Sequence, residues 1–156
     1  MEATLQASNA VSVRPIEAND EARWRALWAG YCAFYEVTLS AEITNHTWAR
    51  IANANSPVQA CVAVDATGEV IGICNYILHE NTWTPTQVCY LEDLFVEPDC
   101  RAVGVGQAMI DWLVAQMKLQ GWSRVYWNTK ENNYRARGLY DKYTPRDPFV
   151  RYVIKA

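Results

Sequence analysis

The stretch Arg101-Ala-Val-Gly-Val-Gly106 stands between an apolar run, Tyr90-Leu-Glu-Asp-Leu-Phe-Val96, and a long amphipathic segment, residues 107–120. A strand that enters a helix through such a loop brings several backbone N–H groups together, and the helix dipole adds partial positive charge. Gly104 and Gly106 allow the backbone to approach an anion closely and to adopt positive φ angles. The stretch therefore predicts a phosphate-binding turn between a strand and a helix.

Two common phosphate-binding motifs do not fit this turn. No Gly-Lys-Ser/Thr follows it, so it is not a P-loop. Met109 stands where the third small residue of a dinucleotide fingerprint belongs. A nucleotide-binding protein that uses this loop is accordingly the least favoured interpretation.

Composition limits the classes of protein. A chain of 156 residues with 51% hydrophobic residues is the size of one domain with a substantial core. A net charge of −3 does not favour nucleic-acid binding. No apolar run approaches the ~20 residues that cross a bilayer, and the N-terminus lacks the pattern of a secretory signal. Five cysteines without a C-x-x-C pair argue against a disulfide framework or a metal site. We expect a cytoplasmic protein without metal.

Hydrophobic periodicity gives the order of elements. We expect a flexible N-terminus over residues 1–10 and one domain over residues 11–156. The expected strands are 11–15, 58–65, 70–78, 87–96, 124–128 and 149–154. The expected helices are 19–36, 41–52, 107–120 and 133–142. This order predicts an α/β fold with a mixed sheet.

A second motif follows the turn: Asn133-Tyr-Arg-Ala-Arg-Gly-Leu-Tyr140-Asp-Lys142. With both motifs present, the chain resembles the GNAT superfamily of acetyl-CoA-dependent N-acetyltransferases, and within it the branch that acetylates histones and polyamines. The resemblance implies a single GNAT-like domain, with a mixed, mostly antiparallel sheet flanked by helices. It also implies acetyl-CoA as co-substrate, an amine acceptor, and a possible homodimer through exchanged C-terminal strands.

The resemblance also implies which residues bind the cofactor. Backbone amides of the turn would hold the pyrophosphate, and the side chain of Arg101 could add a charge contact. The strand before the turn would carry a bulge, pair with the pantetheine arm and supply an oxyanion donor near Leu94 or Phe95. Asn133 would bond the same arm. The implied cofactor-binding residues are Leu94, Phe95, Val96, Arg101, Ala102, Val103, Gly104, Val105, Gly106, Gln107, Asn133 and Tyr140.

Glu92 and Tyr140 are the candidate catalytic residues. A protonated amine must lose a proton before it attacks, and Glu92 could accept that proton or could only anchor the amine. Strict alternation would place Glu92 with Tyr90, Leu94 and Val96 on one face, and Asp93 with Leu91 and Phe95 on the other. We interpret Asp93 as structural. Tyr140 could protonate the thiolate that leaves, or could be a core aromatic residue.

Two classes of function remain open from the sequence. The first is an N-acetyltransferase that acts by direct attack in a ternary complex, and the second is a non-catalytic domain that binds or senses acyl-CoA. Polyamines, small drug-like amines, amino acids and basic protein tails all remain possible acceptors. The loop 142–149 replaces the Gly-Phe that usually follows the last helix in relatives, so their substrates do not transfer directly.

Overall fold

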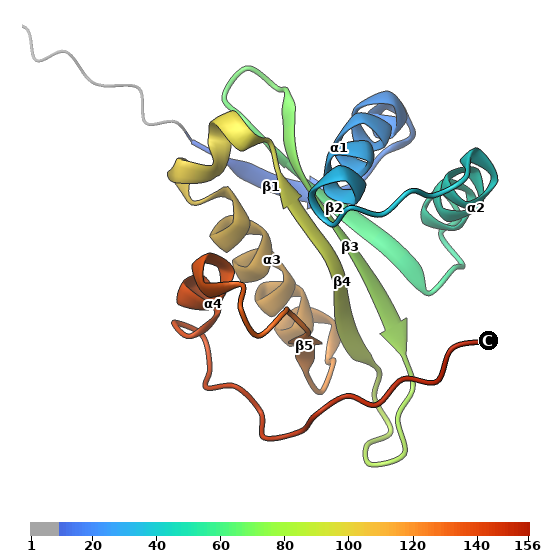
Figure 1. The fold of residues 1–156 in the computed structure, drawn as a ribbon, viewed down its shortest axis with the longest axis vertical. Coiled ribbons are helices and arrows are strands. Elements are labelled where there is room, and N and C mark those ends of the chain that lie inside the picture. Colours follow the sequence, from blue (N-terminus) through green and yellow to red (C-terminus); the bar gives the residue numbers. More distant parts are fainter. Residues whose placement is uncertain (1–9) are drawn as a thin grey trace, which may run out of the picture.

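A computed structural model describes residues 10–156, apart from the side chains of residues 102 and 103. Figure 1 shows a sheet covered by helices on both faces. The five strands lie in the order β1-β2-β3-β4-β5. All neighbouring strands are antiparallel except β4 and β5, which are parallel. The elements are β1 (Ser12–Pro15), η1 (Ala18–Asp20), α1 (Glu21–Phe34), α2 (Ala41–Ile51), β2 (Val58–Val64), β3 (Val70–His79), β4 (Val88–Val96), η2 (Pro98–Val103), α3 (Val105–Gln120), β5 (Val125–Trp127) and α4 (Tyr134–Tyr140).

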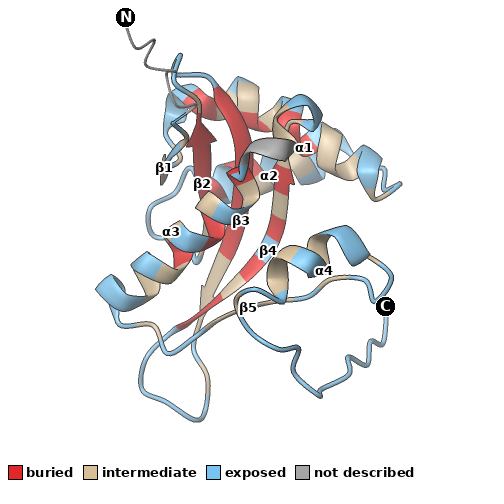
Figure 2. Ribbon diagram, turned by 90° about the vertical axis from the view of Figure 1, so that its left-hand side faces the viewer, coloured by how far each residue is buried: buried red, intermediate tan, exposed pale blue. Residues whose placement is uncertain are grey.

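The core has one cluster on each face of the sheet. On the first face, Trp24, Leu27 and Trp28 of α1 and Trp48 of α2 pack on the sheet. These α1 positions have the i, i+3, i+4 spacing of one helical face. On the second face, α3 and α4 cover a cluster that includes Met109 and Leu113. Figure 2 shows the buried residues concentrated in the central strands and in the helix faces that meet them.

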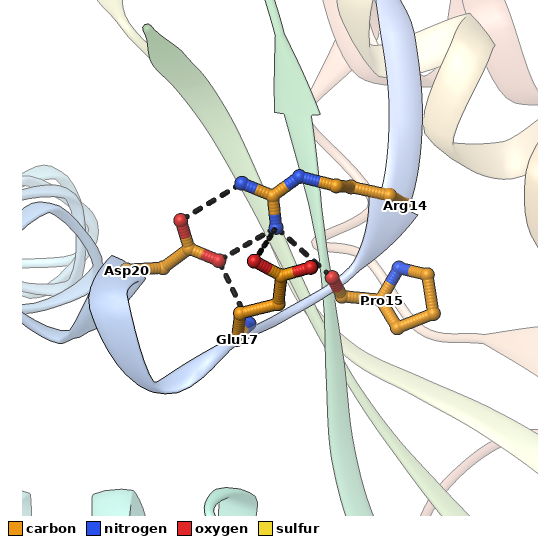
Figure 3. Close-up of polar contacts among 4 residues, drawn as sticks. All are labelled: Arg14, Pro15, Glu17 and Asp20. Carbon is orange, nitrogen blue, oxygen red and sulfur yellow. Dashed lines mark hydrogen bonds and ion pairs between the residues drawn. The ribbon is translucent and has the colours of Figure 1, made fainter. Parts of the chain in front are cut away.

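An ion pair fixes the chain between β1 and α1 (Figure 3). Arg14 donates from both terminal nitrogens to the two carboxylate oxygens of Asp20, at 2.7 and 2.9 Å. Asp20 also accepts from the backbone N–H of Glu17 at 2.7 Å, which closes the turn before α1. Because the Asp20 side chain is only 8% exposed, this bidentate pair replaces solvation that the carboxylate has lost.

Strand β4 contains a bulge at Glu92. Asn75 of β3 lies opposite Asp93, but the next residue, Tyr76, lies opposite Leu91. Glu92 is therefore the extra residue, which re-aims the side chains that follow it. Leu91 packs in the cluster under α3, whereas Phe95 packs in the cluster under α1. Our placement of these two residues on one face is wrong, because simple alternation holds only for an unbroken strand.

The pairing of β4 with β5 ends early. Only Cys89, Tyr90 and Leu91 pair with β5, so within the described chain residues 92–96 of β4 have no strand beside them on that edge. The strand bulge that the family resemblance implies is present, and the sheet opens immediately beyond it.

The predicted elements agree with the structure up to α4, within a few residues at their ends. The strand expected over 149–154 is wrong: these residues form no strand, and Phe149, Val150, Tyr152 and Ile154 are strongly exposed. Figures 1 and 2 show this segment looping away from α4 without joining the sheet. Alternation indicates a capacity to pair, and in this chain the segment 149–154 pairs with no strand. The flexible N-terminus expected over 1–10 lies, except for Ala10, outside the described residues. None of the described helices is long and apolar enough to cross a membrane.

Candidate active site

The turn 101–106 has the conformation that an anion site needs. Gly104 has φ 74° and ψ 24°, a left-handed conformation, and α3 begins immediately after it. The first hydrogen bond of the helix runs from the N–H of Ala108 to the carbonyl of Gly104. The N–H groups of Val105, Gly106 and Gln107 therefore belong to the first turn, where a helix has no internal acceptors.

Three elements of the candidate site meet at Gly106. A Cβ placed on Gly106 would lie 3.7 Å from Leu139 of α4 and 3.9 Å from Leu94 of β4. The turn, the open part of β4 and α4 are thus adjacent in space although they are far apart in sequence. The motifs around residues 101–107 and 133–140 form one region.

The open edge of β4 offers a free backbone donor. The N–H of Glu97 bonds to Ile71 of β3 at 2.8 Å. Because antiparallel residues alternate in the direction of their backbone groups, Phe95 and Asp93 also turn toward β3, and Leu94 and Val96 turn outward. Of the two positions expected from the sequence, Leu94 is consequently the one whose N–H points outward.

The side chain of Arg101 lies away from the first turn of α3. Its Nε donates to the carbonyl of Val96 at 3.1 Å, and its guanidinium lies over the rings of Phe95 and Phe34 at 5.2 and 5.6 Å. In this arrangement the guanidinium stabilises the end of β4 against α1. The guanidinium would have to leave these partners to contact a phosphate directly. Of the two contacts expected of Arg101, only the one through its backbone is compatible with this arrangement.

Glu92 is exposed and lies in the bulge beside the open edge. Partial burial raises the pKa of its carboxyl, the negative charge of Asp93 raises it further, and Arg151 of the C-terminal segment lowers it. A carboxylate with a raised pKa is a stronger base than an ordinary surface glutamate.

Tyr140 lies at the end of α4, with its ring edge-on to Trp127 of β5 at 5.4 Å. Burial raises the pKa of Tyr140 to about 12, and Tyr35 and Cys74 add to the shift. The phenol therefore keeps its proton at neutral pH. Asn133 occupies the N-cap position of α4, but its side chain donates to Thr129 at 3.1 Å and makes no cap hydrogen bond.

A buried polar chain beside Glu92 was not predicted. Trp24 donates to Asn75 at 3.0 Å, and Asn75 donates to Asp93 at 3.1 Å. Asp93 is hydrogen-bonded, as expected of a structural residue, but it faces α1 and not the edge of the sheet. The sequence feature that could have indicated this chain of hydrogen bonds is Asn75, a polar residue inside the apolar run 70–78.

The comparisons with known proteins agree with this geometry. The model of the acetyltransferase (GNAT) family matches residues 22–144. The chain belongs to this family and is an acetyl-CoA-dependent N-acetyltransferase, so a non-catalytic domain is not favoured.

Among its relatives is the D-amino-acid N-acetyltransferase HPA3 of Saccharomyces cerevisiae, 32% identical over 91% of this chain and 89% of that protein. Two solved structures show the fold. A ribosomal-protein-alanine N-acetyltransferase from Brucella melitensis biovar Abortus 2308 has a TM-score of 0.79 at 19% identity, and covers 94% of this chain and 100% of its own. A probable acetyltransferase has a TM-score of 0.82 at 15% identity, and covers 93% and 97%.

Proposed function

We propose that residues 11–156 form one acetyltransferase domain that transfers the acetyl group of acetyl-CoA to the primary amine of a small acceptor, by direct attack in a ternary complex. The observation that carries the proposal is the opening of β4 from β5 beyond the bulge, next to the left-handed turn at Gly104. An extended thioester can lie along such an edge with its phosphates on the helix start.

The cofactor would be held mainly by backbone groups. The N–H groups of residues 101–107 would bind the pyrophosphate, and the outward groups of Leu94 and the N–H of Val96 would pair with the pantetheine arm, since the Val96 carbonyl already accepts from Arg101. Phe95 and Asn133 would complete this wall. The N–H of Leu94 would stabilise the oxyanion that forms when the amine attacks.

Glu92 and Tyr140 would each move one proton of the reaction. Glu92 would accept the first proton of the ammonium, the nitrogen would then bond to the thioester carbon, and the carbon–sulfur bond would break as the nitrogen loses its second proton to water. Tyr140 would donate its proton to the departing thiolate and would be reprotonated from solvent. Cys32 is a poor candidate for a covalent acyl-enzyme, because burial and Asp93 raise the pKa of its thiol.

D-amino acids are the first acceptors to test, since a relative 32% identical is named for that activity. The carboxylates of Glu92 and Asp93 would suit an acceptor that arrives as a cation. Polyamines and basic protein tails, the acceptors of the branch expected from the sequence, are the alternatives.

We also propose a homodimer in which the segment 149–154 pairs with a second copy. Its support is the row of exposed apolar side chains at Phe149, Val150, Tyr152 and Ile154. Monomers should bury such a row or carry polar residues there. A reducing cytoplasm is the proposed compartment, consistent with five free cysteines.

A screen of amine acceptors with detection of the free thiol tests the proposed function. D- and L-amino acids, polyamines and a basic peptide are each mixed with acetyl-CoA and the enzyme. We expect thiol release that depends on the acceptor and is fastest with D-amino acids. Thiol release with no acceptor would contradict it, and a preference for polyamines would correct the acceptor class.

A further inference from the structure

A cavity of about 560 Å³ lies at the other end of the sheet from the open edge of β4. Its volume is within the range of small-molecule sites. β1 ends at Pro15, opposite Cys61, so β2 continues past it for three residues, 58–60, and borders the cavity. The other walls come from the η1 turn, α2, β3 and the second half of α3. No residue that we assign to the cofactor or to acetyl transfer lines it.

Helix α3 holds the cavity apart from the phosphate-binding turn. Trp112, Gln116 and Gln120 recur every four residues, so they form one stripe along the second half of the helix, and all three line the cavity. The turn precedes the first residue of α3, whereas Gln120 is the last. A helix of 16 residues is about 24 Å long. A ligand in the cavity would therefore not touch the cofactor turn.

Tryptophan rings form the apolar part of the cavity wall. Trp112 and Trp122 are half-buried, and their centroids lie 6.2 and 6.0 Å from the ring of Tyr76. Their planes are inclined to that ring by 57° and 48°, so the wall is curved and is not a slot between parallel rings. Trp48 of α2 adds a third indole. The half-buried indoles keep apolar surface that a ligand can cover.

The polar part of the wall consists of uncharged amides. Five amide side chains line the cavity: Asn53, Gln59, Gln87, Gln116 and Gln120. Each amide can both donate and accept hydrogen bonds. Among the described residues of the lining, Glu17 is the only charged one, and its side chain is 66% exposed and lies 4.0 Å from Arg14. The wall thus offers hydrogen bonds in both directions and little charge.

Gln59 shows that one of these amides has spare donors. The hydroxyl of Tyr76 donates to Oε1 of Gln59 at 3.1 Å. Burial raises the pKa of the Tyr76 phenol, so the hydroxyl keeps its proton and remains the donor. The amide nitrogen of Gln59 then points away from Tyr76, and within residues 10–156 it makes no hydrogen bond. Its two N–H groups are available to a ligand.

The lining defines the chemistry of a ligand that would fit. A charged molecule would lose its solvation there without gaining a counter-ion, which is costly. Hydroxyl groups both donate and accept, as amides do, and the C–H face of a saturated ring can pack on an indole. We propose that this cavity is a second binding site, which takes an uncharged sugar. The proposal goes beyond the proposed function, because it concerns a separate site and does not require acetyl transfer.

Calorimetry with maltose as the probe tests the site, in the presence of saturating CoA. We expect saturable binding with a Kd in the millimolar range or below, and no competition with CoA. Glucuronate, which is anionic, and adenosine, which is flat, should each bind at least about tenfold more weakly. No saturable binding of maltose, displacement by CoA, or equal or tighter binding of either other probe would overturn the proposal.

Substitution of Gln116 and Gln120 together by Ala removes two amides from the stripe on α3. Ala favours helices, so the helix should be preserved. We expect maltose to bind about tenfold more weakly, the loss of two ordinary hydrogen bonds. The control is Trp83→Ala, since Trp83 is 87% exposed and lies outside the cavity. Unchanged affinity in the double variant, or an equal loss in Trp83→Ala, would contradict the site.

NMR of the indole N–H groups locates the bound sugar without relying on these variants. The chain has seven tryptophans, and single Trp→Phe variants assign their signals. Maltose should shift the signals of Trp112 and Trp122 and leave those of Trp83 and Trp127 in place. A shift of Trp127, which lies against Tyr140, would place the sugar at the acetyl-transfer site and would overturn the proposal.

Discussion

Glu92 shows how one extra residue in a strand changes the chemistry of its neighbours. The bulge sends Leu91 to the α3 side and Asp93 to the α1 side, so two adjacent carboxylates have different surroundings. Glu92 is exposed and Asp93 is buried. Different environments are what allow two similar groups to take different roles.

Glu92→Gln should lower kcat at neutral pH by about 10²–10⁴-fold, the usual contribution of a general base. The carboxylate must be deprotonated to work, so wild-type activity should fall as the pH drops through the raised pKa of Glu92, above its usual value of about 4.3. The variant should lose less of the wild-type kcat at high pH, where free amine is abundant. A pH–rate profile checks this.

Glu42→Gln, an exposed carboxylate at the start of α2, is the control and should leave the profile unchanged. An unaltered profile in Glu92→Gln would exclude the base. A raised KM with normal kcat would instead support the anchoring role of Glu92.

Tyr140→Phe should reduce kcat by about 10²-fold or more while the Kd for acetyl-CoA stays nearly constant, since only the phenolic proton is removed. The pKa of about 12 keeps that proton in place throughout the assay range. Tyr134→Phe, at the exposed start of the same helix, is the matched control. Near-normal kcat in Tyr140→Phe would show that Tyr140 is a packing residue.

Residue types at the site could be predicted better than their orientations. Glu92, Tyr140 and the outward donor near Leu94 follow from motif positions. The position of the Arg101 guanidinium over Phe95 and Phe34 does not, because it depends on how α1 packs against the end of β4. The chain from Trp24 through Asn75 to Asp93 joins three elements, and no local pattern reports such a contact.

At the scale of elements, the turn between β4 and α3 combines a backbone requirement with an electrostatic one. Gly104 and Gly68 both have positive φ, and an added Cβ would meet nothing within 4 Å at either position. A substitution therefore strains the backbone at both positions. Only Gly104 lies at a helix start, where N–H groups are free.

Gly104→Asp should abolish the rise in Tm that acetyl-CoA causes, because it places a carboxylate where the pyrophosphate would bind. Gly68→Asp should lower the Tm of the free protein by a similar amount and keep the cofactor-dependent rise. Thermal unfolding with and without acetyl-CoA checks both. If Gly104→Asp binds as tightly as the wild type, the phosphate site lies elsewhere.

The elements themselves were predictable because each carries its own signal. Two apolar runs on either side of a turn indicate β2 and β3, the apolar stripe indicates α3, and the glycines mark the turn before it. The opening between β4 and β5 has no such signal. The opening arises because β5 is only three residues long. The strand expected over 124–128 is one residue too long at each end.

At the scale of the whole molecule, the ion pair of Arg14 and Asp20 holds the first strand to the first helix. Arg14→Gln should lower the free energy of unfolding by about 1–2 kcal/mol at neutral pH, since it leaves the Asp20 carboxylate short of donors. Arg25→Gln, which removes a partly exposed pair with Glu21 on α1 and a hydrogen bond to Asn45 of α2, should cost less, about 0.5 kcal/mol.

The loss should depend on pH. Hydrogen bonds from Arg14 lower the pKa of Asp20 in the folded protein. The stabilisation is therefore present above the unfolded pKa, about 3.9, and disappears as the pH falls through the folded value. Urea unfolding at neutral and acidic pH should show the two proteins converging in acid. A constant difference would mean that Arg14 acts through packing.

The C-terminal segment marks the limit of prediction for the whole molecule. Residues 149–154 alternate as a strand should, yet in a single chain they remain exposed. The pattern is local, whereas the pairing that it needs does not form within this single chain. A second copy would supply it.

Direct attack in a ternary complex is the central claim, and initial rates with both substrates varied test it most directly. Acetyl-CoA and a D-amino acid are each varied at several fixed concentrations of the other. We predict double-reciprocal lines that intersect, because both substrates must be bound at the open edge of β4 before the acetyl group moves. Parallel lines, together with an acetylated enzyme by mass spectrometry, would contradict the account, since the acetyl group would then pass through the protein.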